Sequence, residues 1–289
     1  MDFSENDSVD AVLASFADTP DPRLREVTDS LVRHLHGFLR DVRPTIAEWE
    51  RGIEFLTAIG QKSDEHRQEF ILFSDVLGAS MLVETMEAAR QAQDATASTV
   101  LGPFHVVTSP ERELGDTIDT LGTGEACLIE GRVTGPDGVP VPGARIDIWQ
   151  ADERGSYDVE SDRQPLGNGR GLFTADDEGR YRFRSIVPAH YPIPTDGPVG
   201  ELLTATRRHP YRPAHVHFIV EAPGYVPVTT HVFVDGSPYL DSDAVFAVKQ
   251  SLVREFATVD DEAEAARHGL PNPFRRARFD IVLQPEVPA

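Results

Sequence analysis

The chain has 289 residues, 40% of them hydrophobic and 26% charged, which is the composition of a globular protein with an ample core. Its 27 Lys and Arg stand against 48 Asp and Glu, and the formal net charge of −21 argues against a nucleic-acid partner, since cations bind phosphates. The single cysteine, Cys127, excludes an internal disulfide and a Cys-rich metal site. Its apolar neighbours predict a buried structural thiol.

The acidic N-terminal segment has no apolar run of the signal-peptide type, and no stretch approaches the ~18 consecutive apolar residues of a membrane span. We therefore expect a cytoplasmic protein that does not insert into a membrane. The acidic surface would repel an anionic substrate at long range, so a neutral small molecule is the better match.

The first third of the chain has helical patterns. Asp21 and Pro22 predict an N-cap and a first helical position, and Pro44 ends the run. Thr45 and Glu48 form a capping-box pair that opens a second helix through about residue 59. A third helical stretch is expected over residues 64–91, interrupted at Gly78. Apolar residues at spacings of three and four mark one face of the first helix: Leu24, Val27, Leu31, Leu35, Phe38 and Val42.

From about residue 100, short β-branched runs alternate with turn signals. Strands are expected at 126–133, 144–149, 180–186, 216–220, 229–234 and 278–283, and a late helix at 246–257. Many short strands without intervening helices favour a β-sandwich over a parallel α/β sheet. The predicted fold is mainly β, with a helical N-terminal domain over residues 1–99 and a β-sandwich domain over residues 100–289.

His215 and His217 are the clearest candidate metal ligands, because residues i and i+2 of a strand share a face and lie ~6.6 Å apart. The alternative is a pair of polar residues on a solvated strand face, and their apolar neighbours weigh against it. Tyr157 and Tyr191 stand out in turn-rich segments. Taken singly, each is more often a packed turn tyrosine, since a phenol with a pKa of ~10 is a poor ligand unless a strong cation deprotonates it.

Four segments together resemble the intradiol ring-cleavage dioxygenases: residues 100–104, residues 148–152 with Tyr157, residues 191–198 and residues 212–218. The resemblance covers nearly the whole chain, including residues 74–78. It implies one Fe(III) per chain, held by Tyr157, Tyr191, His215 and His217. It also implies a small aromatic diol or triol and O2 as substrates, with the ring cleaved between its two hydroxyl-bearing carbons. Tyr191 is implied as the ligand that substrate displaces.

Within that family, residues 230–233 and 238–245 resemble the hydroxyquinol 1,2-dioxygenases, and His231 stands where catechol enzymes typically have Gln. Hydroxyquinol (benzene-1,2,4-triol) is thus the expected substrate and 3-hydroxy-cis,cis-muconate, or its tautomer maleylacetate, the product. Catechol or a substituted catechol, giving cis,cis-muconates, is the alternative. Leu101 departs from relatives with an aromatic residue there. The implied substrate-binding residues are Leu72, Asp75, Val100, Leu101, Gly102, Pro103, Phe104, Ile193, Pro194, Arg212 and Val245.

Several charged residues have two interpretations. Arg212 is the candidate catalytic stabiliser of negative charge on the reacting ring, and the alternative is a structural pair with a carboxylate. His231 is a candidate catalytic partner near the metal, or a surface histidine. Asp75 either accepts a hydrogen bond from the third hydroxyl of hydroxyquinol or supports the helix break near Gly78. Asp243, like Asp241, is expected to cap the late helix.

Two functions from other classes remain alternatives. Residues 131–144 resemble the opening hairpin of transthyretin-like binding modules, which have no use for the Tyr and His set. A zinc hydrolase would use His215 and His217 with a carboxylate and a water. The family resemblance also implies a homodimer joined through the N-terminal helices, with an amphipathic lipid as a further ligand. Their apolar faces would equally serve an intramolecular core.

Overall fold

The computed structural model describes residues 3–64, 67–90, 94–105, 108–160 and 162–286. The chain forms two compact units, Met1–Ala58 and Ile59–Ala289. The domain boundary predicted at residue 99 falls inside the second unit, where α4 (Glu69–Val76) packs against α6 (Pro198–Ala205). None of the described helices is long and apolar enough to cross a membrane.

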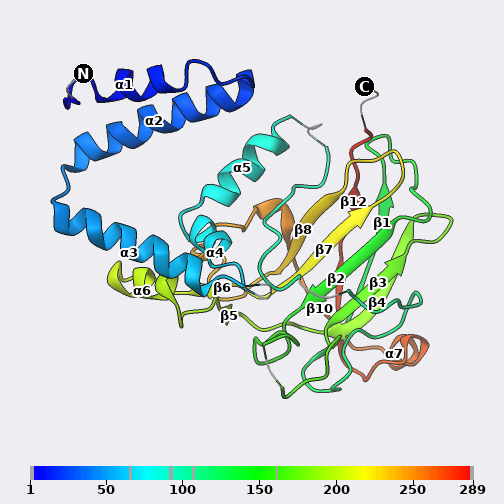
Figure 1. The fold of residues 1–289 in the computed structure, drawn as a ribbon. Coiled ribbons are helices and arrows are strands. Elements are labelled where there is room, and N and C mark those ends of the chain that lie inside the picture. Colours follow the sequence, from blue (N-terminus) through cyan, green and yellow to red (C-terminus); the bar gives the residue numbers. More distant parts are fainter. Residues whose placement is uncertain (1–2, 65–66, 91–93, 106–107, 161, 287–289) are drawn as a thin grey trace. The chain divides into compact units, whose positions relative to one another are not determined.

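Two helices of the first unit, α2 (Pro22–Val42) and α3 (Ile46–Lys62), begin where the sequence predicts, whereas α1 (Ser8–Ser15) has no counterpart among the predicted elements. The unit contains α1, α2 and the start of α3 (Figure 1). Asp21 accepts hydrogen bonds from the backbone N–H groups of Arg23 and Leu24, which caps α2. Thr45 and Glu48 exchange their capping-box hydrogen bonds ahead of α3. The caps and the apolar periodicity therefore set both helix starts.

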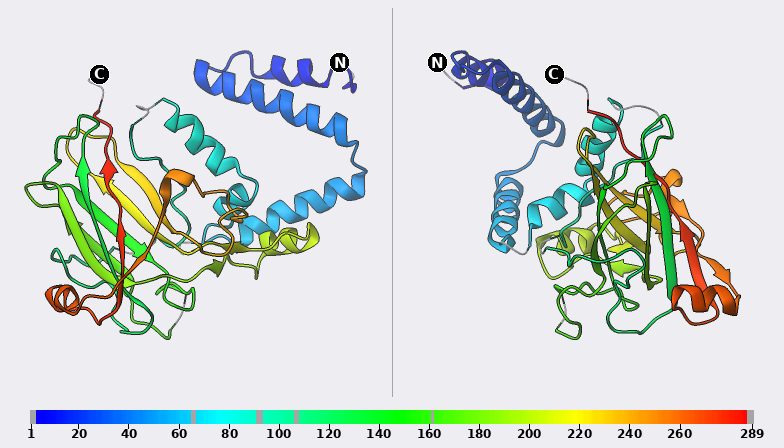
Figure 2. Two further views of the ribbon diagram at one scale, coloured as in Figure 1. Left: turned by 180° about the vertical axis from the view of Figure 1, so that it is seen from behind. Right: turned by 90° about the vertical axis from the view of Figure 1, so that its right-hand side faces the viewer.

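Two further helices, α4 and α5 (Ala79–Ala88), replace the single interrupted stretch predicted over residues 64–91, whose residues 65–66 and 91 lie outside the described residues. Gly78 separates them with a φ of 73°, a left-handed conformation that glycine adopts without a steric penalty. Helix α7 (Glu262–His268) lies on the opposite side of the second unit from α5 (Figure 2).

The helix predicted over residues 246–257 is wrong. That segment contains a 3₁₀ turn, Gln250–Leu252, and the short strands β9 (Val253–Arg254) and β10, which begins at Ala257 (Ala257–Val259). The backbone of Phe246 has a φ of 60°, which is incompatible with a right-handed helix. The Asp243 carboxylate accepts the N–H groups of Val245 and Ala247, so the turn it closes takes the place of a helix start.

Two five-stranded sheets and a two-stranded ribbon make up the β structure. The first sheet has β1 (Ala126–Thr134) between β4 (Arg180–Ile186) and the parallel strands β11 (Phe274–Arg278) and β12 (Ile281–Val282), with β10 beside β11. The second has the order β3 (Arg170–Thr174), β2 (Arg145–Gln150), β7 (His215–Glu221), β8 (Val228–Val234), β9. The ribbon pairs β5 (Tyr191–Pro192) with β6 (Tyr211–Arg212).

The two large sheets face each other across an aromatic core. Phe218 of β7 contacts Phe183 and Tyr181 of β4, with ring centroids 6.2 Å apart in both pairs. Cys127 of β1 is fully buried, which confirms the predicted structural thiol, and burial raises the pKa of its thiol. The predicted β-sandwich with a helical N-terminal part is thereby confirmed.

Strand pairing brings the chemically interesting residues together. In the antiparallel pair β7–β8, His217 lies opposite His231, and on the other side of β7 it lies opposite Trp149 of β2. In the ribbon, Tyr191 lies opposite Arg212, three residues before His215. One end of the second sheet and the ribbon therefore supply side chains to a single place.

Candidate metal centre

Four buried side-chain atoms converge at this place. The Tyr157 hydroxyl lies 3.2 Å from the Tyr191 hydroxyl and 3.0 Å from Nε2 of His217. The Tyr191 hydroxyl lies 3.3 Å from Nε2 of His215, and the two histidine Nε2 atoms are 3.1 Å apart. Neighbouring ligands around one ion have this spacing when the metal–ligand bonds are ~2 Å long. The structure thus brings together the four residues predicted as metal ligands.

The chemistry of these donors fits a highly charged cation. Burial raises the pKa of both phenols, that of Tyr157 well above its usual value, and Arg212 opposes the rise without cancelling it. A phenol in this position becomes an anionic ligand only if a strong cation compensates its charge. Two tyrosinates beside two neutral imidazoles favour a trivalent over a divalent ion, because the higher charge stabilises the two deprotonated phenols more strongly.

Hydrogen bonds fix which histidine nitrogens face the centre. Nδ1 of His215 is 2.7 Å from the carbonyl oxygen of Pro213, to which it can only donate, so Nε2 carries the lone pair. Burial lowers the pKa of His215, His217 and His231 well below its usual value, and the positive charge of Arg212 acts in the same direction. All three rings are therefore neutral, which is the form that ligates a metal.

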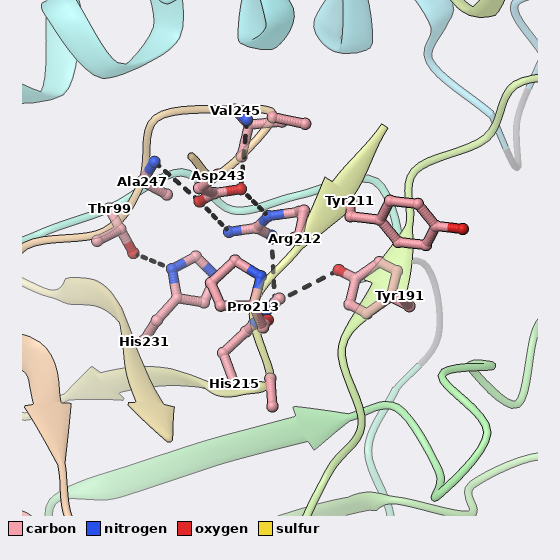
Figure 3. Close-up of polar contacts among 12 residues, drawn as sticks. Thr99, Tyr191, Tyr211, Arg212, Pro213, His215, His231, Asp243, Val245 and Ala247 are labelled. Carbon is pink, nitrogen blue, oxygen red and sulfur yellow. Dashed lines mark hydrogen bonds and ion pairs between the residues drawn. The ribbon is translucent and has the colours of Figure 1, made fainter. Parts of the chain in front are cut away.

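The His231 side chain hydrogen-bonds to His217 and does not enter the space between the four donors. Its Nε2 lies 2.7 Å from Nδ1 of His217. Its Nδ1 lies 2.6 Å from Oγ1 of Thr99, and Figure 3 shows this second contact. The ring is fully buried, so the alternative of a surface histidine is wrong. Among the described residues, the cluster of His, Cys, Asp and Glu ligand atoms holds His215, His217 and His231 and no carboxylate. That composition does not favour a zinc hydrolase with a carboxylate ligand.

A buried ion pair supports the Tyr157 loop. Asp158 and Arg170 are bonded side chain to side chain, and both side chains are 1% exposed. Arg170 also donates to the backbone carbonyl of Phe104, whose ring stacks on Tyr157 at 4.4 Å between centroids. Trp149 stacks on the neighbouring candidate ligand, His217, at 4.5 Å. Tyr157 and His217 are therefore each held by an aromatic plane, and the rotamer of neither is free.

Arg212 is 2% exposed and binds Asp243, with 3.1 Å between Nε and Oδ1. Burial acts to lower the pKa of Arg212, but Asp243 and the two phenols outweigh it, so the guanidinium stays charged. Its Nη1 also donates to Nε2 of His215 at 3.1 Å (Figure 3). Arg212 thus pairs with a buried carboxylate, and it also lies beside the four candidate donors.

Apart from Arg212 on β6, the predicted substrate-binding residues lie on four segments. Leu72 and Asp75 are buried on α4, and residues 100–104 pass beside the candidate metal ligands, where a Cβ on Gly102 would lie 3.3 Å from Cε1 of His217. Ile193 and Pro194 follow β5, and Val245 follows Asp243 in the turn. Leu101 is 44% exposed, so the residue that departs from its relatives is partly open to solvent.

Several supporting residues were missed at the sequence level. Asp243 was expected to cap a helix and instead binds Arg212, and Thr99 carried no signal beyond its position before the 100–104 segment. His105 binds Asp147 at 3.0 Å while its ring contacts Trp149. The only local signal in the sequence for the Asp158–Arg170 ion pair is that Asp158 directly follows Tyr157.

Comparison with known proteins shows which families this chain matches. Residues 101–285 match the family described as Dioxygenase, and residues 21–95 match the one described as Catechol dioxygenase N terminus. The chain is 48% identical to a 6-chlorohydroxyquinol 1,2-dioxygenase of Cupriavidus pinatubonensis, covering 99% of this chain and all of the relative. It is 51% identical to a hydroxyquinol 1,2-dioxygenase of Nocardioides simplex, covering 97% and 96%.

A solved structure agrees over nearly the full length. The hydroxyquinol 1,2-dioxygenase of Pseudomonas putida DLL-E4 superimposes with a TM-score of 0.89 at 45% identity, covering 98% of this chain and 99% of that one. Identity at this level over the whole length, together with two phenols and two imidazoles around one point, leaves no place for a non-catalytic binding module. The chain belongs to the intradiol ring-cleavage dioxygenase family.

Proposed function

We propose that this protein cleaves hydroxyquinol with O2 between its two adjacent hydroxyl-bearing carbons, giving 3-hydroxy-cis,cis-muconate and its tautomer maleylacetate. The observation that carries the proposal is the ring of four buried donors, Tyr157, Tyr191, His215 and His217, with neighbouring atoms 3.0–3.3 Å apart. These four would hold one Fe(III) per chain. Bound there, the ion supplies the chemistry that lets an aromatic diolate react with O2.

The two phenols are suited to accept the substrate's protons. Burial raises the pKa of Tyr157 and Tyr191, so a tyrosinate released from a cation at this place is a strong base. Tyr191 lies on a two-residue strand of the ribbon, whereas Tyr157 is backed by the stack on Phe104 and the Asp158–Arg170 pair. The difference in support favours Tyr191 as the group that moves and takes a hydroxyl proton.

Arg212 provides a fixed positive charge at the same place. Its guanidinium contacts His215 and influences the pKa of both phenols, while Asp243 holds its other edge. A preorganised cation in a dry site stabilises negative charge that develops on the substrate, and this effect is worth several kcal/mol. We assign that role to Arg212, on the ring being cleaved.

Product analysis tests the proposed reaction. Purified protein reconstituted with iron and given hydroxyquinol under air should form 3-hydroxy-cis,cis-muconate and maleylacetate, detected by mass spectrometry. Ligand sets with two tyrosinates suit Fe(III), whereas two histidines with one carboxylate suit Fe(II) oxygenases. A semialdehyde from cleavage outside the diol would refute the assignment, and so would full activity from a colourless protein containing only zinc.

Asp75 is proposed to recognise the third hydroxyl of hydroxyquinol. Its side chain is 2% exposed, and its Oδ1 has no hydrogen-bond partner among the described residues. Burial raises the pKa of Asp75, and the Ser80 hydroxyl and the charge of Arg212 oppose that rise. A substrate hydroxyl that donates to Oδ1 would satisfy a group that is costly to leave unpaired in the protein interior.

Asp75→Asn is expected to lower kcat/KM for hydroxyquinol about ten- to a hundredfold, the value of a hydrogen bond to a charged group. Turnover of catechol, which lacks the third hydroxyl, should change much less. The ratio of kcat/KM for the two substrates is therefore the quantity to measure. Equal losses on both substrates, with a lower melting temperature, would mean that Asp75 only supports the helix break at Gly78.

We further propose a homodimer formed through the N-terminal helices, with an amphipathic lipid as a ligand of the same apolar surface. The six residues of the predicted apolar face of α2 are 46–62% exposed, and no residue of that helix is buried, so an intramolecular core does not use this face. Sedimentation velocity should give twice the chain mass, and Leu31→Asp with Leu35→Asp should give the monomer. A monomeric wild type would reject the dimer, and a lipid-free solvent extract would reject the lipid.

A further inference from the structure

The buried residues Thr99, His231 and His217 form a line of hydrogen bonds that ends at the candidate metal centre. Oγ1 of Thr99 lies 2.6 Å from Nδ1 of His231, and Nε2 of His231 lies 2.7 Å from Nδ1 of His217. All three side chains are at most 1% exposed, so water does not compete for these bonds. The mechanism described above uses only the last of the three residues.

The proton positions along this line follow from His217, whose Nε2 must be unprotonated to bind a metal. Nε2 of His217 faces Tyr157 and His215, and to ligate a metal it must carry the lone pair. Nδ1 of His217 then holds the proton and donates to Nε2 of His231. The proton of His231 is therefore on Nδ1 and is donated to Thr99. The reverse direction would place a proton on Nε2 of His217 and block it as a ligand.

We propose that His231 and Thr99 are positioning residues that hold His217 in its metal-binding tautomer and increase its basicity. The inference rests on the proposed iron site and deepens it, because His231 contacts His217 at Nδ1, the ring nitrogen that does not face the other donors, and Thr99 contacts His231. Strand pairing sets the contact, since His231 on β8 lies directly opposite His217 on β7. The backbone N–H of Thr99 donates to the carbonyl of Thr229 on the same strand, which holds its hydroxyl in place. Hydrogen-bond partners of this kind typically change metal affinity 10–100-fold.

Iron retention tests this line directly. His231→Leu removes the acceptor for the His217 proton, whereas His231→Gln keeps an acceptor through its amide oxygen. In the holoenzyme we expect His231→Leu to release Fe(III) to an excess of chelator 10–100-fold faster than wild type. The tyrosinate-to-iron absorption band should shift as well, because a weaker His217 ligand changes the charge on the ion. His231→Gln should restore both properties to near the wild-type values.

Thr99 gives a second and milder test, in case His231→Leu does not fold. Thr99→Val removes the acceptor for the His231 proton and should accelerate iron release several-fold, while Thr99→Ser should not. Thr230→Val is the matched control, because this equally buried hydroxyl on β8 donates to the carbonyl of Ala97 and is outside the line. Thr230→Val should leave iron release and the band unchanged.

The outcomes separate the inference from the proposed function. A wild type that takes up no iron and shows no tyrosinate band would refute the proposed function itself. If wild type binds iron and folded His231→Leu and Thr99→Val retain it with an unchanged band, the proposed function survives and the positioning role is overturned. The melting temperatures of the iron-free variants identify any loss that comes only from unfolding.

Discussion

Tyr157→Phe is expected to lose much of the tyrosinate-to-iron colour and to lower kcat for hydroxyquinol by at least a hundredfold. The substitution removes one of the two anionic donors, and the remaining Tyr191 is the group that we propose the substrate displaces. The Tyr157 hydroxyl contacts both Tyr191 and His217, so its loss removes one of the four converging donors. A visible spectrum, an iron determination and a product assay on the same preparation measure the three consequences.

Tyr181→Phe is the matched control for this substitution. Tyr181 is also a fully buried tyrosine, but its hydroxyl donates to the backbone carbonyl of Phe279 in the sandwich core. Losing that bond should cost about 1–3 kcal/mol of stability, because the carbonyl is left unpaired. Colour and turnover should persist in the folded protein. Were Tyr157→Phe to keep its colour and activity, Tyr157 would not be a ligand.

Local signals in the sequence predict those features that depend on only a few neighbouring residues. The Asp21 and Thr45 caps predict the starts of α2 and α3, and the i, i+2 spacing places His215 and His217 on one face of β7. These features depend on a few neighbouring residues, so periodicity and capping rules are sufficient to predict them.

The site as a whole depends on contacts that no local pattern encodes. Tyr157 and Tyr191 reach the histidines only through a loop and a two-residue ribbon, so the family resemblance, and not their spacing, pointed to them. Thr99 lies 132 residues from His231 along the chain. The residues after Asp243 have helical propensity. The Asp243 carboxylate instead pairs with Arg212 and closes a turn with the N–H of Val245, and that turn excludes the helix. Long-range pairing of charged groups overrides local propensity there.

Arg212→Met should lower kcat about 10²–10³-fold, which is the usual effect of removing one preorganised electrostatic stabiliser. It should also destabilise the fold by about 3–5 kcal/mol, because Asp243 would remain as a buried carboxylate without its cation. Measured alone, the Arg212→Met variant does not separate the loss of turnover from the loss of stability. Urea denaturation reports the loss of stability, and steady-state kinetics reports the loss of turnover.

The double variant Arg212→Met with Asp243→Asn separates them. Asparagine removes the unpaired charge, and its single amide oxygen can still accept one of the two N–H bonds that now go to separate carboxylate oxygens, from Val245 to Oδ1 and from Ala247 to Oδ2, so the turn keeps one of its two closing hydrogen bonds. Most of the lost stability should return, because replacing both members of a buried ion pair costs far less than removing one. Turnover should stay low, since the cation beside the reacting ring is still missing. If the double variant regains wild-type kcat together with its stability, Arg212 serves only to pair with Asp243, and the developing charge on the substrate must be stabilised by other groups.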